Sequence, residues 1–191
     1  MFVRLAKVKD CQEIYDLIKD GDSGMTTLPK SKDEVLERIS WSKKSLNKKA
    51  KRPDKDSYLF VLKENNRIVG ISAIYTSVSK NGTSVFFKQK KKNISSKVFK
   101  FKKSLDVIQL HIVKNPYTEL GTLYLHPDFR GKGRGSLLSL ARFKFMALWP
   151  ERFDQKVVAE IRGKVDKDET SIFWKHFSKY FLMKKCSTIM K

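Results

Sequence analysis

The residues best suited to chemistry lie in the stretch HPDFRGKGRGSLLSL, which runs from His126 to Leu140. An apolar run typical of a strand precedes it, and a long apolar run typical of a helix follows. Backbone N–H groups at such a turn, and at the start of the helix, lack partners within the helix and can bind phosphate oxygens. We therefore expect a phosphate or pyrophosphate site here, the alternative being a glycine-rich connector with solvated charges. The turn consists of Arg130, Gly131, Lys132, Gly133, Arg134 and Gly135.

The spacing of these glycines excludes two nucleotide-binding motifs. A P-loop requires G-x-x-x-x-G-K followed by Ser or Thr, which the chain does not contain. The dinucleotide fingerprint requires G-x-G-x-x-G, whereas the glycines here follow G-x-G-x-G. Glycine allows a positive φ and lets an anion approach the backbone closely. The turn therefore suits a pyrophosphate that is not bound through either motif.

Two side chains are candidates for acid–base chemistry. Glu160 interrupts an apolar run at residues 156–163, on the same side as Val158 and Arg162. A carboxylate buried there needs a partner or a raised pKa, and a raised pKa is typical of general bases. The alternative is an ion pair with Arg162. His126 is the second candidate, and a role in forming the turn explains it equally well.

The other histidines and the aromatic residues indicate packing rather than chemistry. His111 lies in a predicted strand, and His176 lies in a predicted final helix that is rich in aromatic residues. No set of residues has the spacing of a metal site. Helical spacing predicts core positions for Phe143, Phe145, Phe173, Trp174 and Phe177.

The chain of 191 residues has a net charge of +21, from 41 basic and 20 acidic residues. Such a charge favours an anionic partner, although lysine-rich surface composition also explains it. Residues 88–103 contain eight lysines and no acid. The chain has no helix-turn-helix, zinc spacing or aromatic-interleaved RNA motif, so we do not expect nucleic acid as a partner.

Cysteine content and hydropathy indicate the compartment. Cys11 and Cys186 are too few for a disulfide framework, which favours a reducing environment. No apolar run approaches the ~18 residues of a membrane span, and the N-terminus lacks the apolar core of a signal peptide. We expect a soluble, cytoplasmic protein.

Periodicity predicts the elements that position the turn. A strand at residues 2–6 precedes a helix for which Asp10 is the expected N-cap, and Ser31 and Glu34 form a capping box at a second helix. Residues 43–57 read as a linker, and two β-rich runs joined by ENN predict a hairpin. We expect residues 84–115 to form strands and loops at an exposed sheet edge.

The C-terminal part adds a strand at residues 119–125, a buried helix from 136 to 149, a central strand at 156–163 and a final helix. The order β-α-α-β-β-(β)-β-α-β-α predicts an α/β (α+β) fold with a mixed central sheet flanked by helices.

The turn resembles the R/Q-x-x-G-x-G/A signature of the GNAT superfamily of acyl-CoA N-acyltransferases, with Arg130, Gly133 and Gly135 in the signature positions. A more specific resemblance, to arginine N-succinyltransferase, rests on four segments in matching order: GMTTLP, LGTLYLHPDFRGKGRGSLLSLARFKFMA, ERFDQKVVAEIRG and FWKHFSKYF. The resemblance ends near Leu182. It implies a GNAT-like domain at residues 1–182 and a short basic tail at 183–191.

The resemblance implies transfer of a succinyl group from succinyl-CoA to the α-amine of L-arginine, or of ornithine in some members. It implies no metal. In the superfamily, the strand at 119–125 and the strand at 156–162 splay apart to admit the thioester. Thr26 and Thr27 would lie near the acceptor. The donor would lie against Leu123, Tyr124 and Leu125, and its pyrophosphate against residues 130–135 and Ser136.

The family's chains are longer, with a second half of similar fold that contains the proposed proton-donor histidine. That histidine has no counterpart here, so the resemblance implies a truncated form, a homo- or hetero-oligomer, or a partner chain that supplies the second half. Two alternatives stay open: a GNAT acyltransferase with another amine or acyl-CoA, and a non-catalytic basic protein that binds anions or nucleic acid.

Overall fold

The computed structural model describes residues 1–19, 27–79, 84–161, 166 and 171–177. Its strands are β1 (Phe2–Leu5), β2 (Ser57–Glu64), β3 (Arg67–Val78), β4 (Ser84–Ser96), β5 (Phe101–Val113), β6 (Tyr117–Leu125) and β7 (Val157–Val158). Its α-helices are α1 (Cys11–Ile18), α2 (Lys32–Asn47), α3 (Arg134–Leu148) and α4 (Ile172–Phe177). Short 3-10 helices are η1 (Val8–Asp10), η2 (Pro127–Phe129) and η3 (Pro150–Arg152).

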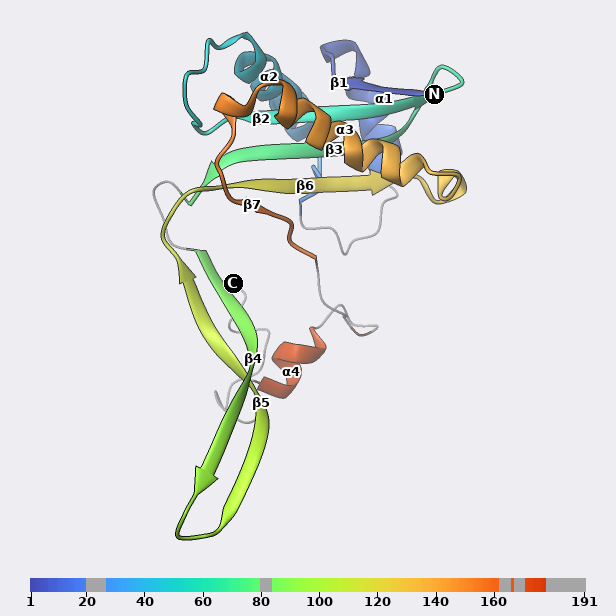
Figure 1. Cartoon of the computed structure of the whole chain (residues 1–191). Helices are drawn as coiled ribbons and strands as arrows, with labels where there is room; N and C mark the ends of the chain where they lie inside the picture. Colours follow the sequence, from blue (N-terminus) through green and yellow to red (C-terminus); the bar gives the residue numbers. More distant parts are fainter. Residues whose placement is uncertain (20–26, 80–83, 162–165, 167–170, 178–191) are drawn as a thin grey trace.

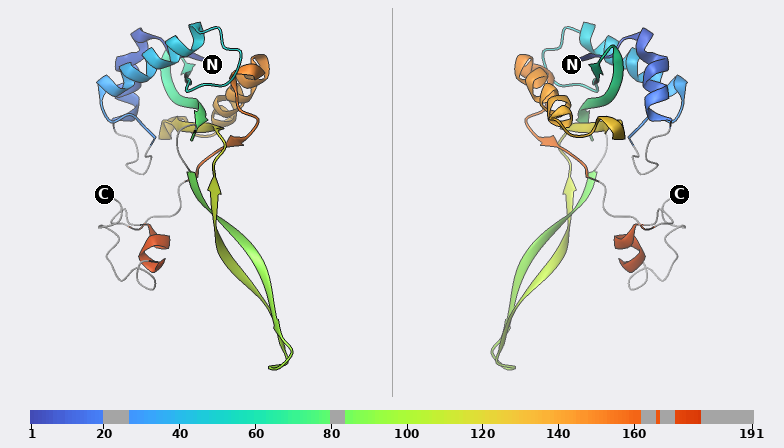
Figure 2. Two further views of the ribbon diagram at one scale, coloured as in Figure 1. Left: turned by 90° about the vertical axis from the view of Figure 1, so that its left-hand side faces the viewer. Right: turned by 90° about the vertical axis from the view of Figure 1, so that its right-hand side faces the viewer.

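The body of the molecule is a five-stranded sheet with the order β1-β2-β3-β6-β7. Its strands pair antiparallel, except that β6 and β7 are parallel. Helices α1 and α2 cover one face and α3 covers the other, as Figures 1 and 2 show. The predicted mixed sheet flanked by helices is confirmed.

Both faces of the sheet contribute to the core. Ile14 and Ile39 of the helices pack with Val61 and Ile71 on one face. On the other face, Phe145 of α3 packs against aromatic residues of β2. Because both faces are covered, β2 is buried at consecutive positions rather than at alternate ones.

The first helices differ in detail from the expected caps. Asp10 precedes α1, but its carboxylate bonds to the Arg4 guanidinium at 2.6 and 2.8 Å and does not cap the helix. Ser31 Oγ accepts from Glu34 N–H at 3.1 Å, whereas the Glu34 carboxylate accepts from Lys30 N–H rather than from Ser31. Helix α2 continues to Asn47, so the predicted linker begins inside a helix.

The expected hairpin at the centre of the sheet is confirmed. Strands β2 and β3 pair from Ser57–Tyr75 to Glu64–Arg67. Asn65 and Asn66 have φ angles of 47° and 63°, and Asn tolerates this left-handed region better than most residues.

Residues 84–113 do not form an edge of the main sheet. Strands β4 and β5 pair only with each other, in a separate two-stranded sheet that projects from the body (Figures 1 and 2). The lysines therefore lie on a projecting hairpin, whose base contacts β6 through Phe86 and Tyr117 and α4 through Phe87 and Phe173. The sequence predicted their exposure but not this separation, because alternation alone does not identify a strand's partner.

Two predictions of burial were wrong. Only Leu138, Arg142 and Phe145 of α3 are buried, while Leu140 is 62% exposed, because one side of the helix has no neighbour among the described residues. Strand β7 contains two residues at the edge of the sheet and is not central.

The aromatic residues expected in the core divide into two groups. Phe145 is buried, whereas Phe143 and Phe173 are 46% and 39% exposed. His176 is also exposed, so the expected packing role is wrong for it. The Trp174 side chain and residues 178–191, which include the predicted tail, lie outside the described residues. None of the described helices is long and apolar enough to cross a membrane.

Candidate active site

The glycine turn connects β6 to α3, as predicted. Gly131, Lys132 and Gly133 have φ angles of 91°, 49° and 75°, and Gly133 is the N-cap of α3. A Cβ on any of the three glycines would meet nothing within 4 Å, so the backbone is open to a ligand. The first hydrogen bond of the helix runs from Leu137 N–H to Gly133 O, at 2.9 Å. The N–H groups of Gly135 and Ser136 precede it and have no acceptor within the helix.

The three cations of the turn are not equivalent. Arg130 and Lys132 are exposed. The Arg134 guanidinium instead turns back to β2 and bonds to both Glu64 carboxylate oxygens, at 2.6 and 2.9 Å. These hydrogen bonds lower the pKa of Glu64. The side chain of Arg134 therefore anchors the start of α3, and is not a free cation as the sequence suggested.

Strand β6 contains a bulge just before the turn. Its register with β3 passes from Gly121–Ala73 to Tyr124–Ile71, so Thr122 and Leu123 stand opposite a single residue of β3. Thr122 has a φ of 51°, an uncommon conformation for a β-branched residue. Such strain is typical of functional sites. Of the predicted donor-binding residues, Leu123 is exposed, Tyr124 is buried and Leu125 is half-buried.

Strand β7 covers only the first part of the outer edge of β6. Strand β7 pairs with β6 only at Thr118–Val157 and Glu119–Val158. In the described part of the chain, β6 from Leu120 to Leu125 has no partner on that edge. The separation agrees with the splayed strands that the resemblance implied.

The two predicted acid–base candidates do not occupy catalytic surroundings. Glu160 lies past the end of β7 and is exposed, so the expected burial is wrong; its proposed partner Arg162 is outside the described residues. His126 Nδ1 accepts from Asp128 N–H at 3.3 Å, and its ring contacts Phe129 at 5.8 Å. His126 thus helps to form the turn, as the alternative stated.

The structure instead brings Glu119 close to the bulge. Burial, and secondarily the charge of Glu160, raise the pKa of Glu119. A Cβ on Gly121 would lie 2.9 Å from Tyr75 Cε2 and 3.5 Å from Glu119 Oε1, which places the three residues together. The sequence did offer a signal, an acid within the apolar run before the turn, but its side of the strand could not be assigned.

Polar groups form a chain next to Glu119. Tyr75 Oη and Thr122 Oγ1 are 2.9 Å apart, and Arg38 of α2 donates to Tyr75 Oη at 2.8 Å. Arg38 and Thr122 also donate to the carbonyl of Thr27, at 2.6 and 3.1 Å. The Thr27 carbonyl is therefore close to the bulge. The resemblance placed Thr26 and Thr27 near the acceptor, and Thr26 lies outside the described residues.

A second arginine lies on the opposite face of β6. Arg142 of α3 is 4% exposed and donates to Gly121 O at 3.4 Å. Its other bonds go to Ser139, at 3.4 Å to the carbonyl and 3.0 Å to the hydroxyl. Burial lowers its pKa. Within the described residues, no group of His, Cys, Asp and Glu is arranged to hold a metal.

The chain as a whole is also similar to known proteins. A family described as "Arginine N-succinyltransferase beta subunit" matches residues 1–190. The chain belongs to this family. The match extends past residue 182, where the resemblance seen in the sequence ended.

Individual members of the arginine N-succinyltransferase family support the assignment. The chain is 34% identical over 185 residues to an arginine N-succinyltransferase of Yersinia pestis (strain Pestoides F), covering 95% of this chain and 52% of the relative. It is 32% identical over 182 residues to "Arginine N-succinyltransferase subunit beta" of Pseudomonas aeruginosa, covering 95% and 53%. The chain thus spans about half the length of these relatives.

The solved arginine/ornithine succinyltransferase subunit AI from Pseudomonas aeruginosa has a similar structure. Its TM-score is 0.77 at 27% identity, over 94% of this chain and 55% of that one. The structural match again covers about half of the longer chain.

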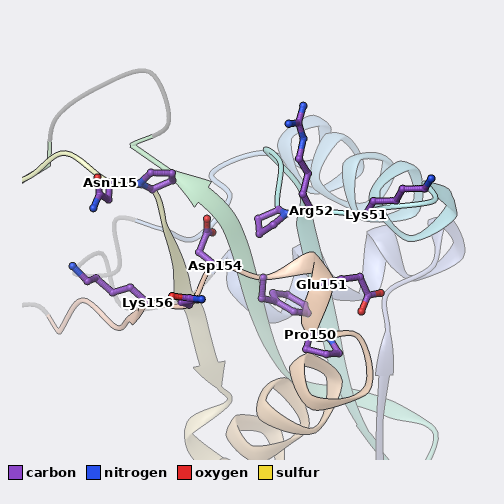
Figure 3. Close-up of a pocket in the computed structure, with 11 residues that line it drawn as sticks. Lys51, Arg52, Asn115, Pro150, Glu151, Asp154 and Lys156 are labelled. Carbon is purple, nitrogen blue, oxygen red and sulfur yellow. The ribbon is translucent and has the colours of Figure 1, made fainter.

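A pocket of about 800 Å³ lies at the other end of β6, away from the turn (Figure 3). Asn115 and Pro116, just before β6, and the segment after α3 line it. The Asp154 carboxylate in this region bonds to Ser77 N–H at 2.8 Å and to Thr118 Oγ1 at 3.1 Å. Asp154 therefore links β3 to β6. The pocket is separate from the candidate active site.

Proposed function

We propose that the chain forms the site of an arginine N-succinyltransferase, which transfers succinyl from succinyl-CoA to the α-amine of L-arginine. One observation supports this proposal most strongly: three features follow one another along the chain. They are the edge of β6 that β7 does not cover, the bulge at Thr122, and the exposed turn at Gly131–Gly133 that leads into α3. A second amine such as ornithine is compatible with the same geometry.

The turn holds the pyrophosphate of the donor. Three consecutive residues with positive φ expose backbone N–H groups, and the N-terminus of α3 adds a partial positive charge. Arg130 and Lys132 are the exposed cations that accompany them. The pantetheine arm then follows the free edge of β6 along Leu123–Leu125, where unpaired backbone groups supply hydrogen bonds.

Glu119 and Arg38 provide the acceptor side. An amine must lose its proton to attack a thioester, and a carboxylate with a raised pKa is suited to receive it. Glu119 therefore acts as the general base. The Arg38 guanidinium, next to Tyr75 and Thr27, carries a positive charge that suits the α-carboxylate of an amino acid.

The reaction forms a bond between the amine nitrogen and the thioester carbonyl carbon and breaks the carbon–sulfur bond. The bulge interrupts the pairing of β6 with β3, and backbone N–H groups there would stabilise the developing oxyanion. The leaving thiolate requires a proton. None of the described residues supplies an evident donor for it, and we assign this step to a second chain or copy that completes the site.

Binding of the donor tests the proposal directly. We expect isothermal titration calorimetry to detect binding of succinyl-CoA, and the Gly133→Val variant to abolish it, because a β-branched residue at a φ of 75° distorts the turn. Strain of this kind costs about 1–3 kcal/mol.

The Lys100→Val variant is the matched control, since Lys100 also has a positive φ of 48° but lies at the tip of the β4–β5 hairpin. It should bind the donor as the wild type does. No binding by the wild type at millimolar succinyl-CoA would refute the proposed function, and equal binding by Gly133→Val would refute the role of the turn.

A further inference from the structure

Arg142 is a buried cation whose hydrogen-bond partners are all neutral. It is 4% exposed, and it donates to Gly121 O, Ser139 O and Ser139 Oγ. In the described part of the chain, no carboxylate forms an ion pair with it. Removing an unpaired charge from water is costly, and burial accordingly lowers the pKa of this group. An anionic ligand would offset that cost.

The position of Arg142 is as informative as its burial. The guanidinium contacts the carbonyl of Gly121, two residues before Leu123 in the bulge. The outer edge of β6 is free of β7 along this stretch. A donor held by its pyrophosphate at the turn runs along β6 from Leu125 towards Gly121. Its acyl group is the end that approaches Arg142.

The length of a succinyl group matches the distance along β6 from Leu123 to Gly121. Two residues of strand span about 7 Å, at ~3.3 Å per residue. The far carboxylate of succinyl lies three carbon–carbon bonds from the thioester carbonyl, roughly 4 Å at about 1.5 Å per bond. A charge-assisted hydrogen bond adds about 2.8 Å. An acetyl group is too short to reach the same guanidinium.

We propose that Arg142 binds the terminal carboxylate of the succinyl group, and so selects a dicarboxylic acyl-CoA over acetyl-CoA. The inference rests on the proposed function, because it requires the donor to lie along β6. It goes further by naming the residue that distinguishes the acyl groups. Arg142 is a specificity residue and takes no part in proton transfer.

The test compares three ligands that differ only in the acyl group. Calorimetry with succinyl-CoA, acetyl-CoA and free CoA is performed on the wild type and on the Arg142→Met variant, which retains length but loses charge. We expect succinyl-CoA to bind Arg142→Met about 10- to 100-fold more weakly than wild type, as for loss of a hydrogen bond to a charged group. Affinities for acetyl-CoA and CoA should stay within about twofold.

Arg152→Met is the matched control. Arg152 is a partly buried arginine that bonds to Ser45 O and Tyr58 Oη, away from the free edge of β6. Its replacement removes the same charge and should leave the preference for succinyl-CoA unchanged.

A purely structural role for Arg142 predicts a different result, in which Arg142→Met weakens all three ligands alike. That result, or an unchanged preference for succinyl-CoA, would overturn the inference. If Arg142→Met does not fold, Arg142→Gln gives the answer: it keeps N–H donors for the neutral partners but loses the charge, and an unchanged preference for succinyl-CoA would contradict the inference. Failure of the wild type to bind any of the three ligands would instead refute the proposed function.

Discussion

At the scale of single residues, the structure makes Glu119, rather than Glu160, the candidate general base. The sequence offered Glu160 as a candidate general base, because it interrupts an apolar run that predicted a buried strand, with an ion pair to Arg162 as the alternative. The strand ends at Val158, and Glu160 is exposed. Glu119 is half-buried beside Tyr75 and Gly121, and burial raises its pKa. Charge burial depends on neighbours that a single run of sequence does not reveal.

The raised pKa of Glu119 has a consequence for stability. A carboxyl group with a higher pKa in the folded state stabilises the fold while protonated, and this contribution is lost as the pH rises through the folded-state pKa. The loss begins above the ordinary value of 4.5. Glu119→Gln should therefore unfold at higher urea than wild type at neutral pH, with a difference that shrinks towards pH 4.

Urea midpoints measured from pH 4 to pH 8 check this prediction, with Glu37→Gln as a control that removes an exposed carboxylate of α2 whose charge does not contribute to the pKa of Glu119. Glu119→Gln should also slow succinyl transfer by about 10²- to 10⁴-fold, as for loss of a general base. A pH-independent difference in stability would show that the carboxyl group of Glu119 is not perturbed by burial.

At the scale of elements, the β4–β5 hairpin stands apart from the body. A two-stranded hairpin is at best marginally stable in water. One face of this hairpin near the body is apolar yet largely exposed, formed by Val85, Phe87, Ile108, Leu110 and Ile112. The core clusters of the main sheet contain no residue of either strand.

The main sheet should therefore fold without the hairpin. Replacing residues 86–111 by a short Gly-Ser turn is expected to leave the circular dichroism of the body and the affinity for succinyl-CoA unchanged, with a melting temperature within a few degrees of wild type. Replacing Ile71 by Asp, inside the main core, is the contrasting change and should prevent folding. Unfolding of the hairpin deletion would show that β4 and β5 stabilise the body.

Helix α3 shows a similar limit of prediction. Its sequence is apolar on several sides, and only one of these sides packs against the sheet. Its position directly after the glycine turn was predicted, because glycine spacing and a following apolar run are local signals, but the helix begins at Arg134 rather than at Ser136. Which of its apolar faces is covered depends on elements distant in sequence.

At the scale of the whole molecule, length and charge bear on function. The chain spans about half of the relatives it matches, and its net charge of +21 favours anionic ligands such as a CoA thioester. We expect succinyl transfer to arginine to rise at least tenfold when a second chain that carries the other half of the family's fold is added. Turnover with labelled succinyl-CoA measures this, and full activity of the chain alone would contradict it.

The sequence by itself determined the mixed fold, the central hairpin and the turn at residues 130–135, because these depend on local periodicity and on the φ angles that glycine and asparagine permit. Only the tertiary structure decided that Arg134 binds Glu64, that Glu119 rather than Glu160 is partly buried, and that Arg142 lies beneath Gly121. These features arise where β2, β3, β6 and α3 meet. Burial and pairing between distant segments are set by packing, which no single stretch of sequence encodes.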